Sequence, residues 1–292
     1  MNVALILNYK AATETVTCVE SILQHCTSVD HIVLVDNDSQ DGSVEAFNEW
    51  KQTTGQSKVT VLANPENNGY AGGNNYGIRW ALNNLDITNF WIVNNDTYVD
   101  CDAFKPLQDA LEKNDKQFVG SIILSAETGR LECYGGGKVY ALLGKTKLLG
   151  KGLALENIQN LQDKPDYVMG CSLAFSKSLL DQVGLMDEEY FMYSEEVDWQ
   201  YQAKKLGITS QVIPESRIYH HGSMSSGGRS AFYHYYRNRA AVRFNKRFYG
   251  SAFAFVSACL LSGIMAIQEF RKPNLVWSGI KGAFKGVTMS VK

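Results

Sequence analysis

The 292-residue sequence has few of the features that mark several large protein classes. Its six cysteines are scattered without a Cys-x-x-Cys pair, which argues against zinc sites and disulfide frameworks and favours a reducing compartment. The opening MNVALILNYK has no basic start, so we expect a first strand there and no secretory signal. With 45% hydrophobic and 20% charged residues, the composition is typical of a folded soluble chain and argues against disorder.

The glycine-rich stretch NPENNGYAGGNNYGI, residues 64–78, lacks two nucleotide-binding signatures. It contains neither the lysine of a P-loop nor a Gly-x-Gly-x-x-Gly pattern, so ATP hydrolysis and hydride transfer lose support. We expect the glycines from Gly69 to Gly73 to precede a helix that carries Asn74. Glycines there would let the backbone approach a ligand, and the helix N-terminus would attract phosphate.

Acidic residues are almost missing from the C-terminal region of the chain. Residues 229–292 contain 11 Lys and Arg but a single acid, Glu269, and carry a formal charge of +10, whereas residues 1–228 carry −12. This division predicts an acidic main body and a basic C-terminal region with a separate task.

Charge is absent altogether from residues 248–268, a run of 21 positions with basic residues on both sides. A membrane-spanning helix needs about 20 apolar residues, so the length is sufficient. Several serines and a glycine interrupt the run, so an interfacial helix pair fits as well. A helix buried against the body is the third alternative, and the basic excess favours association with lipid.

What is present is an alternation of strand-like and helix-like segments, which predicts a mostly parallel, Rossmann-like central sheet with helices on both faces. The expected strands are residues 2–9, 31–37, 58–65 and 90–96, and the expected helices are 15–26, 43–52 and 72–84. Ligands of such sheets bind beyond the carboxyl ends of the strands. Polar residues stand at those ends, namely Asn8, Asp36, Asn37, Asp38 and Asp96.

The second half of the body is less regular. Residues 120–170 are rich in glycine and predict loops and β-ribbons. A strand followed by a helix is expected over 165–184, then a helix from Glu195 to Gly207, and a strand over 210–221 that ends in two histidines. Neighbouring side chains of a strand point to opposite faces, so we expect only one of His220 and His221 to face a site.

The stretch VDNDSQDGS, residues 35–43, has three readings. It is typical of Asx-rich turns. It could instead form an edge at which Asp36 or Asn37 pairs with a nucleotide base. Alternatively, Asp36 could be the nucleophile and Asp38 the general acid of a Mg²⁺-dependent phosphohydrolase.

Two further stretches carry carboxylates. In WIVNNDT, Asp96 alone is a poor metal ligand, but with diphosphate oxygens and His220 it would be adequate for Mg²⁺ or Mn²⁺. In YSEEVDW, a carboxylate at a helix start could act as general base towards a hydroxyl, or could only favour the helix dipole.

Together these stretches resemble the inverting family-2 glycosyltransferases of the GT-A fold, in particular the bacterial rhamnosyltransferase-like branch. The resemblance runs in order through about three quarters of the chain, over ILNYKAATETVTCVESIL, VDNDSQDGS, NNGYAGGNNYGI, WIVNNDT, MDEEYFMYSEEVDW, YHHGS and YYRNR. It implies a GT-A catalytic domain over 1–228 and a basic, apolar, membrane-associating helical region over 229–292.

The resemblance also implies roles for single residues. Glu196 would be the catalytic base, with Glu195 as a substitute, and Asp96 and His220 would be the metal ligands. The residues implied for binding the nucleotide sugar are Asn8, Asp36, Asn37, Asp38, Gly73, Asn74, Asn94, Asn95 and Arg237. Two departures stand out, because the family's first metal-motif carboxylate is Asn94 here, and its usual catalytic Asp is Glu196.

The implied reaction is inverting transfer of a sugar, L-rhamnose from dTDP-L-rhamnose, to a saccharide on a lipid diphosphate carrier in bacterial surface polysaccharide synthesis. The implied location is peripheral, at the cytoplasmic face of the inner membrane, with no nucleic acid partner. The alternatives are the phosphohydrolase and a non-catalytic scaffold that binds nucleotide sugars.

Overall fold

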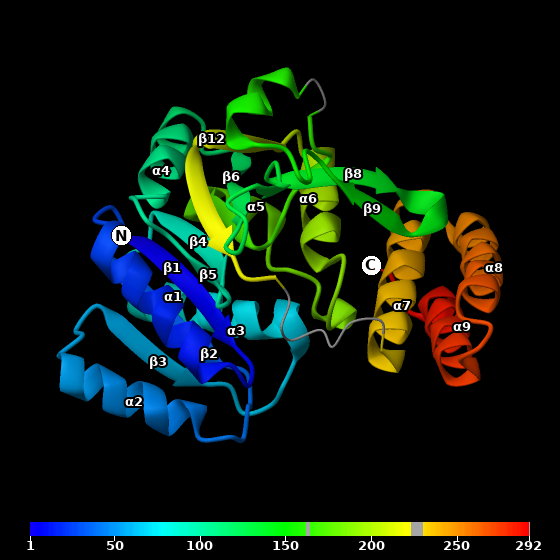
Figure 1. Ribbon diagram of the computed structural model, residues 1–292, viewed down its shortest axis with the longest axis horizontal. Helices are drawn as coiled ribbons and strands as arrows, with labels where there is room; N and C mark the ends of the chain where they lie inside the picture. The colour runs from blue at the N-terminus through cyan, green and yellow to red at the C-terminus, as the bar shows by residue number, and fades with distance from the viewer. Residues whose placement is uncertain (162–163, 223–229, 292) are drawn as a thin grey trace.

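The computed structural model describes residues 1–161, 164–222 and 230–291. A curled central sheet forms the middle of the body, and three C-terminal helices lie beside it (Figure 1). The strands of the central sheet are β1 Asn2–Asn8, β2 His31–Asp36, β3 Val59–Ala63, β4 Asn89–Asn94, β5 Thr97–Tyr98, β6 Gln117–Ser125, β7 Leu131–Cys133, β11 Ser172–Ser176 and β12 Thr209–His220.

The sheet has the order β3-β2-β1-β4-β11-β6-β12-β5, with β7 paired to β6. The β1–β2, β1–β4, β2–β3 and β6–β12 pairs are parallel, whereas β11 runs antiparallel to both of its neighbours. This confirms the predicted mostly parallel α/β sheet. The register pairs Asn8 with Asp36 and Leu7 with Asn94, so the polar ends of three strands meet at one edge.

Helices cover both faces of this sheet because successive strand residues point to opposite sides. Ala4 and Ile6 of β1 pack in one core with α1, α2 and α4, while Val3 and Leu5 pack in a second core with α3, α5 and α6. The helices of the body are α1 Ala12–His25, α2 Ser43–Thr54, α3 Gly69–Asn84, α4 Phe104–Lys113, α5 Lys177–Val183 and α6 Glu195–Lys205.

Two expectations about local structure are wrong. Residues 117–125 form β6, a buried central strand, although most of it lies in the stretch that was expected to be loops and ribbons. The helix expected after Gly73 begins at Gly69 instead, and Gly73 lies inside it. A Cβ at Gly73 would stand 2.5 Å from Leu7 Cδ1, so this glycine lets α3 pack closely on β1.

The remainder of the glycine-rich middle does form a β-ribbon. The strands β8 Gly136–Tyr140 and β9 Lys145–Leu148 make a hairpin, joined by a short 3-10 helix at Ala141–Leu143, and β10 Tyr167–Val168 adds the third strand. In Figure 1 this hairpin reaches from the body to the C-terminal helices.

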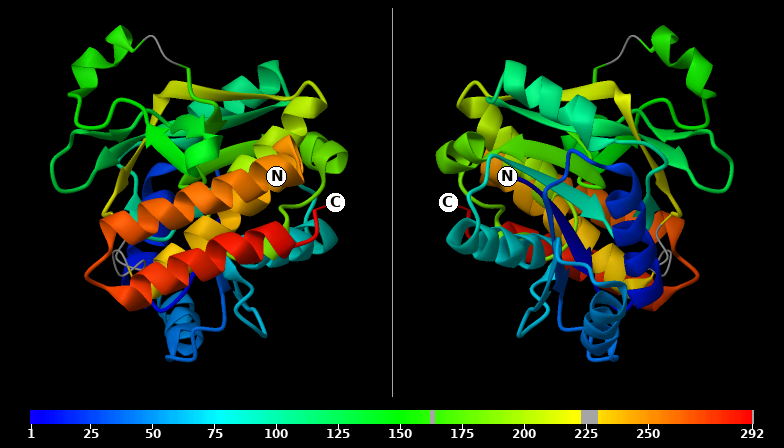
Figure 2. Two further views of the ribbon diagram at one scale, coloured as in Figure 1. Left: turned by 90° about the vertical axis from the view of Figure 1, so that its right-hand side faces the viewer. Right: turned by 90° about the vertical axis from the view of Figure 1, so that its left-hand side faces the viewer.

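The C-terminal helices are α7 Ala231–Tyr249, α8 Ser251–Gln268 and α9 Pro273–Thr288. Figure 2 shows α8 and α9 as the outer layer, with α7 between them and the body. Among the described residues, only α8 is long and apolar enough to cross a membrane by length and composition.

Candidate active site

A cavity of about 540 Å³ opens among the ends of β4 and β12, the β8–β9 hairpin and the starts of α6 and α7. Its wall includes six of the residues predicted from the sequence: Asn94, Asp96, Glu195, Glu196, His220 and Arg237. These residues come from positions up to 143 apart in the chain, and the fold brings them to one hollow.

Asp96 and His220 lie together because β5 pairs with the end of β12. The pairing sets His220 opposite Thr97, and the His221 backbone N–H donates to the Asp96 carbonyl at 3.0 Å. The His220 Nε2 atom lies 3.3 Å from Asp96 Oδ1. His221 is exposed and its ring lies 5.5 Å from that of Tyr98, so only the first histidine faces the cavity.

A third group, Glu132 of β7, completes this arrangement. His220 Nδ1 lies 2.9 Å from Glu132 Oε2. Burial by itself would lower the pKa of His220, but the carboxylates of Asp96 and Glu132 outweigh it and raise the pKa to about 9. Glu132 therefore fixes the orientation of the ring whose other nitrogen faces Asp96, as outer partners of metal-binding histidines do.

The pair of Asp96 and His220 suits a divalent cation only with further ligands. Asp96 Oδ1 is buried, and its 3.3 Å contact with His220 Nε2 is an ion pair without hydrogen-bond geometry, so among the described residues this oxygen keeps room for another ligand. Within the described chain, no three His, Cys, Asp or Glu side chains group into a metal site. Mg²⁺ and Mn²⁺ commonly take a small number of protein ligands and complete their shell with phosphate oxygens and water, so the two residues fit that type of site.

Glu195 and Glu196 are the first residues of α6 and line the same cavity. Glu195 is 4% exposed, and its Oε2 has no hydrogen-bond partner among the described residues. Burial, and secondarily the Glu196 carboxylate, raise the pKa of Glu195 well above its usual range. Burial also raises the pKa of Glu196, which stays partly exposed. A partly exposed carboxylate with a raised pKa is suited to accept a proton.

The segment before Glu195 is strained. Phe191, Tyr193 and Ser194 are three of the six non-glycine residues with positive φ in the described chain, at 62°, 70° and 65°. Such conformations cost roughly 1–3 kcal/mol each and persist only where the surroundings fix them. The α3 helix is one fixing element, because the Tyr70 N–H donates to the Phe191 carbonyl at 2.7 Å. A Cβ at Gly69 would lie 1.8 Å from that carbonyl, so only glycine fits there.

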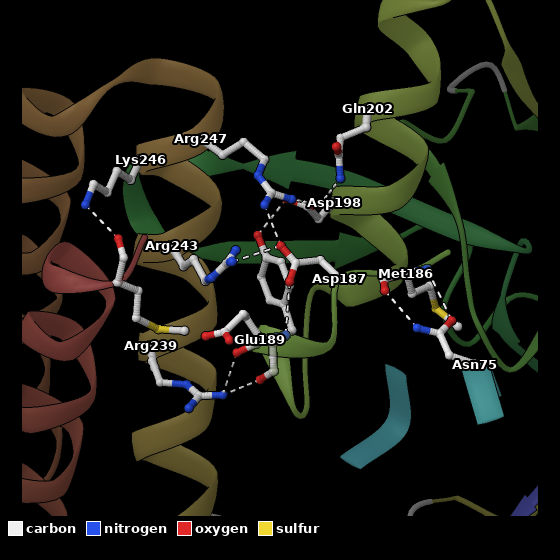
Figure 3. Close-up of polar contacts among 12 residues, drawn as sticks. Asn75, Met186, Asp187, Glu189, Asp198, Gln202, Arg239, Arg243, Lys246 and Arg247 are labelled. Atoms are coloured by element: carbon white, nitrogen blue, oxygen red, sulfur yellow. Dashed lines mark hydrogen bonds and ion pairs between the residues drawn. The ribbon is translucent and has the colours of Figure 1, made fainter. Parts of the chain in front are cut away.

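The second fixing element is α7, whose arginines bind residues on both sides of the segment 191–194 (Figure 3). Arg239 donates to the Tyr190 carbonyl, and Arg243 lies 2.8 Å from the Asp187 carboxylate. Arg247 donates to both Asp187 and Asp198, and Asp198 is fully buried in α6. The helix that carries the candidate base is thus ion-paired to the C-terminal region.

This cluster accounts for part of the basic excess of the C-terminal region. The basic excess of residues 229–292 was expected to indicate lipid, yet three of its arginines, 239, 243 and 247, bind the acidic body. These arginines form an interface between the C-terminal region and the body, and two of them form it through ion pairs.

Arg237 lies two residues before Arg239 in α7. Its Nη2 donates to the Gly144 carbonyl at 2.7 Å, at the tip of the β8–β9 hairpin. Arg237 and Gly144 both line the cavity. The guanidinium therefore holds the hairpin and adds a positive charge to a cavity whose wall also carries several carboxylates.

The other predicted binding residues lie outside the cavity wall. Asn8 and Asp36 are buried at the strand ends, where Asn8 Nδ2 donates to Asp36 Oδ1 at 2.7 Å. Ser39 donates to both oxygens of Asp36, by its hydroxyl at 2.6 Å and its N–H at 2.9 Å. A carboxylate that is 3% exposed and hydrogen-bonded at both oxygens does not suit the nucleophile of a phosphohydrolase, which must reach its substrate.

The asparagines of this edge form a buried hydrogen-bond network. Asn37 accepts from Asn64 at 2.8 Å and donates to the Gly69 carbonyl at 3.1 Å. Asn95 donates to the Thr15 hydroxyl at 2.8 Å, and Asn74 donates to the carbonyl one turn before it at 2.9 Å. Together with the Asn8–Asp36 hydrogen bond, these contacts join the ends of β1 and β2 to the start of α3.

Asp38 and Gly73 also lie apart from the cavity wall. Asp38 has a φ of 59° and accepts from Gln40 Nε2 at 3.0 Å in the turn after β2. Gly73 faces Leu7 inside α3, so the close approach that requires glycine there is to the protein itself.

Sequence reasoning missed Glu132, and also the tyrosines Tyr70, Tyr167, Tyr193 and Tyr233 of the cavity wall. Their positions depend on β7 pairing with β6, on the β8–β9–β10 sheet and on the packing of α7. None of these contacts has a local sequence signal.

Two curated relatives are similar in sequence. The chain is 25% identical over 207 residues to the low-salt glycan biosynthesis hexosyltransferase Agl10 of Haloferax volcanii, covering 70% of this chain and 62% of that protein. It is 33% identical over 72 residues to the N-acetylglucosaminyl-diphospho-decaprenol L-rhamnosyltransferase of Mycobacterium tuberculosis, covering 25% of this chain and 24% of that protein. The chain therefore spans less than two thirds of the length of either relative.

The fold also matches solved structures. GalNAc-T7 with UDP, GalNAc and Mn²⁺ superposes with a TM-score of 0.69 at 16% identity, covering 97% of this chain and 56% of that protein. At this identity the likeness establishes the fold, and it confirms the predicted GT-A architecture. The model of glycosyl transferase family 2 matches residues 4–184, more than half of the chain. The chain belongs to glycosyl transferase family 2.

Proposed function

We propose that this chain transfers a hexose from a nucleoside-diphosphate sugar to a hydroxyl group, with inversion at the anomeric carbon. The observation that carries the proposal is the shared cavity, because Glu196, Asp96 and His220 all line its wall. Direct displacement at a sugar carbon requires a base and a group that binds the diphosphate, both within reach of the same bound sugar.

Glu196 takes the proton of the attacking acceptor hydroxyl. Its partial exposure lets it reach the substrate, and burial raises its pKa so that it holds a proton more firmly than an ordinary glutamate. Glu195 is the more buried of the two and is the alternative base. Proton transfer to a positioned base typically contributes about 10²–10⁴-fold in rate.

Asp96 and His220 hold the metal side of the site, and Asn94 adds an amide beside them. A bound Mg²⁺ or Mn²⁺ would neutralise the charge that develops on the leaving diphosphate. Arg237 adds a second positive group at the same cavity. We place the nucleotide at the edge formed by the ends of β1 and β2, where the partly exposed Asp38 and Asn95 can contact it. The buried Asn8, Asp36 and Asn37 would hold this edge in shape from beneath, with Gly73 and Asn74 of α3 beside them.

The donor that we propose is dTDP-L-rhamnose, and the acceptor is a saccharide on a lipid diphosphate. The name of the mycobacterial relative, an L-rhamnosyltransferase acting on a decaprenol-linked sugar, supports both. The product would belong to a bacterial surface polysaccharide such as O-antigen. Such an acceptor would place the enzyme at the cytoplasmic face of the inner membrane, and nucleic acid has no role in the reaction.

A panel of nucleotide sugars tests the donor. In a thermal-shift assay with and without Mn²⁺, dTDP-L-rhamnose is expected to raise the melting temperature more than UDP-, GDP- or other dTDP-sugars, and more strongly with Mn²⁺. Ligand at about 100 times its Kd stabilises the folded state by about 2.7 kcal/mol, which such an assay detects. A larger shift with another donor would replace rhamnose, and no shift with any donor would contradict the transferase.

Removing the Asp96 carboxylate tests the metal. The Asp96→Asn variant is expected to lose most of the Mn²⁺-dependent component of donor binding, with affinity for Mn²⁺ in the presence of donor lowered about tenfold or more, since disturbing even outer partners of a metal site costs about 10–100-fold. Asp100→Asn is the control, because Asp100 lies four residues away, accepts from the Tyr219 hydroxyl at 3.0 Å and is absent from the cavity wall. Equal Mn²⁺ dependence in both variants would remove Asp96 from the metal site.

A further inference from the structure

The outer surface of α8 and α9 exposes a continuous set of large apolar side chains, which we name the apolar face. Its members are Phe255, Val256, Leu260 and Ile267 of α8, Phe270 after α8, and Trp277 and Phe284 of α9. Ile267 is 77% exposed, Trp277 69% and Phe270 66%. Folded chains seldom leave such a patch in water, and where they do it marks an interaction surface.

The apolar face is one surface and not scattered residues. The rings of Phe255 and Phe284 lie 6.2 Å apart and join the two helices at one end. At the other end Phe270 and Trp277 line a groove of about 430 Å³ with four other residues of the same helix pair. Figure 2 shows both helices side by side as the outer layer of the molecule.

The charges around the apolar face are all positive. Arg271, Lys272, Lys281 and Lys285 are exposed, and none of them pairs with a carboxylate among the described residues. The single acid of residues 229–292, Glu269, is 8% exposed. Unlike Arg243 and Arg247, these cations are not used by the body. A second copy of the chain would set cations against cations, whereas an anionic lipid surface is complementary to them.

The α8 helix packs along α7. Its inner side is buried on α7, where Asn245 Nδ2 donates to the Ser257 hydroxyl at 2.8 Å, and both residues are fully buried. With 18 residues it is about 27 Å long, short of the roughly 30 Å of a bilayer core. Crossing the bilayer would bury charged α7 and α9 with it, so the fitting arrangement is a helix in the interface plane.

The helix that carries much of the apolar face is also close to the cavity. The 3-10 turn at Ala141–Leu143 exposes Leu142 and Leu143, each 39% exposed, whereas Ala141 and Gly144 on either side of them line the cavity. The Ser257 hydroxyl of α8 donates to the Leu142 carbonyl at 3.0 Å. One turn of chain therefore separates the inner side of α8 from the candidate active site, and the apolar face lies on the other side of the same helix, which is about 10 Å thick.

We propose that the apolar face docks flat on an anionic bilayer, with Phe270, Trp277 and Ile267 inserted at the headgroup level and the four cations at the lipid phosphates. This proposal rests on the proposed function for its biological purpose: docking would bring the cavity to the membrane surface, where a lipid-linked acceptor presents its sugar. The docking itself needs neither donor nor metal.

Vesicle binding by the full chain, without nucleotide sugar, tests the proposal. Cosedimentation is expected with vesicles of phosphatidylglycerol and phosphatidylcholine, and about tenfold less with phosphatidylcholine alone. Ile267→Ser with Trp277→Ser, and separately Lys281→Glu with Lys285→Glu, are each expected to weaken binding to the anionic vesicles about tenfold or more. All four side chains are exposed, so the fold should survive, which circular dichroism checks.

Matched controls lie on the body. Leu206→Ser changes a 59% exposed side chain at the end of α6, and Lys113→Glu reverses an exposed charge at the end of α4, so both should bind vesicles as the parent chain does. Trp277 supplies a direct reading: its fluorescence should shift to the blue on binding, and Trp277→Phe should remove the shift.

Three results would overturn the proposal. They are equal binding of all variants, no binding to either vesicle, and sedimentation of the free chain as a dimer that Trp277→Ser dissociates. Each of them would leave the donor panel unaffected, and failure of the donor panel would leave vesicle binding unaffected. The two proposals therefore fail separately.

Discussion

The Glu196→Gln variant is expected to transfer sugar about 10²–10⁴-fold more slowly than the parent enzyme, with donor Kd changed less than about threefold. Glutamine keeps the size of the side chain and its place at the start of α6 but cannot accept a proton. The loss should therefore appear in kcat. Single-turnover transfer of a radiolabelled sugar and a separate titration of the donor measure the two quantities.

Glu195→Gln separates the two neighbouring carboxylates. Glu195 is buried and faces the cavity beside Glu196, and the rate should fall less than for Glu196→Gln if the more exposed residue is the base. Glu189→Gln is the matched control, since Glu189 is an exposed acid six residues before Glu195. Unchanged transfer after removal of both Glu195 and Glu196 would favour the non-catalytic scaffold.

The pH dependence follows from the same burial. Glu196 must be ionised to act, and burial raises its pKa above the usual value of about 4.3. The rate should therefore rise with pH through the raised pKa and fall on the acidic side at a higher pH than for an ordinary glutamate. In Glu196→Gln this acidic limb should disappear from the residual rate.

Much of the site was predictable because it rests on local patterns. Apolar strands that end in Asn8, Asp36 and Asp96 predict a polar edge, since parallel strands end on the same side of a sheet. The acidic start of α6 and the histidine at the end of β12 are likewise local signals. Asp96, Glu196 and His220 meet at one cavity, whereas Asn8 and Asp36 lie outside its wall, and β6, which lies between β11 and β12 in the sheet, was not predicted.

What could not be predicted depends on contacts between distant segments. Glu132 reaches His220 across 88 residues, and Arg247 reaches Asp187 across 60. In the sequence, Arg247 is one of several basic residues beside an apolar run, and nothing distinguishes it from the others. Only the packing of α7 shows which cations serve the body and which, such as Lys281, face outward.

The Arg247→Met variant is expected to lose about 3–5 kcal/mol of unfolding free energy, because removal of one partner leaves a buried charge uncompensated. Asp198 is fully buried, and without Arg247 it keeps only the hydrogen bonds from Tyr190 and Gln202. Most domains have about 5–15 kcal/mol in total, so this is a large share. Urea unfolding measures the loss, and a change near zero would contradict the assigned ion pair.

Two further variants test whether the loss of stability in Arg247→Met comes from the ion pair. Lys177→Met removes an exposed ion pair with Asp181 and should change stability little. Asp198→Asn added to Arg247→Met should recover a share of the loss, because it removes the unpaired charge with the cation. If both changes were merely disruptive to packing, the double variant would be no more stable than the single one.

The loss should also depend on pH in a fixed direction. Burial raises the pKa of Asp198 and Arg247 opposes that rise, so without the arginine the folded-state pKa should rise further above the unfolded value of about 3.9. A carboxyl group whose pKa is higher in the folded than in the unfolded state destabilises the fold at pH values above the unfolded-state pKa. This destabilisation shrinks as the pH falls towards the unfolded-state pKa. The difference in unfolding free energy between Arg247→Met and the parent chain should therefore be smaller at pH 5 than at pH 8.

A truncation that removes α8 and α9 together with Arg247 would also remove the ion pair to Asp198 and so destabilise α6, the helix that bears Glu196. Point changes on the apolar face leave that ion pair in place, so they, and not deletions, separate membrane binding from catalysis.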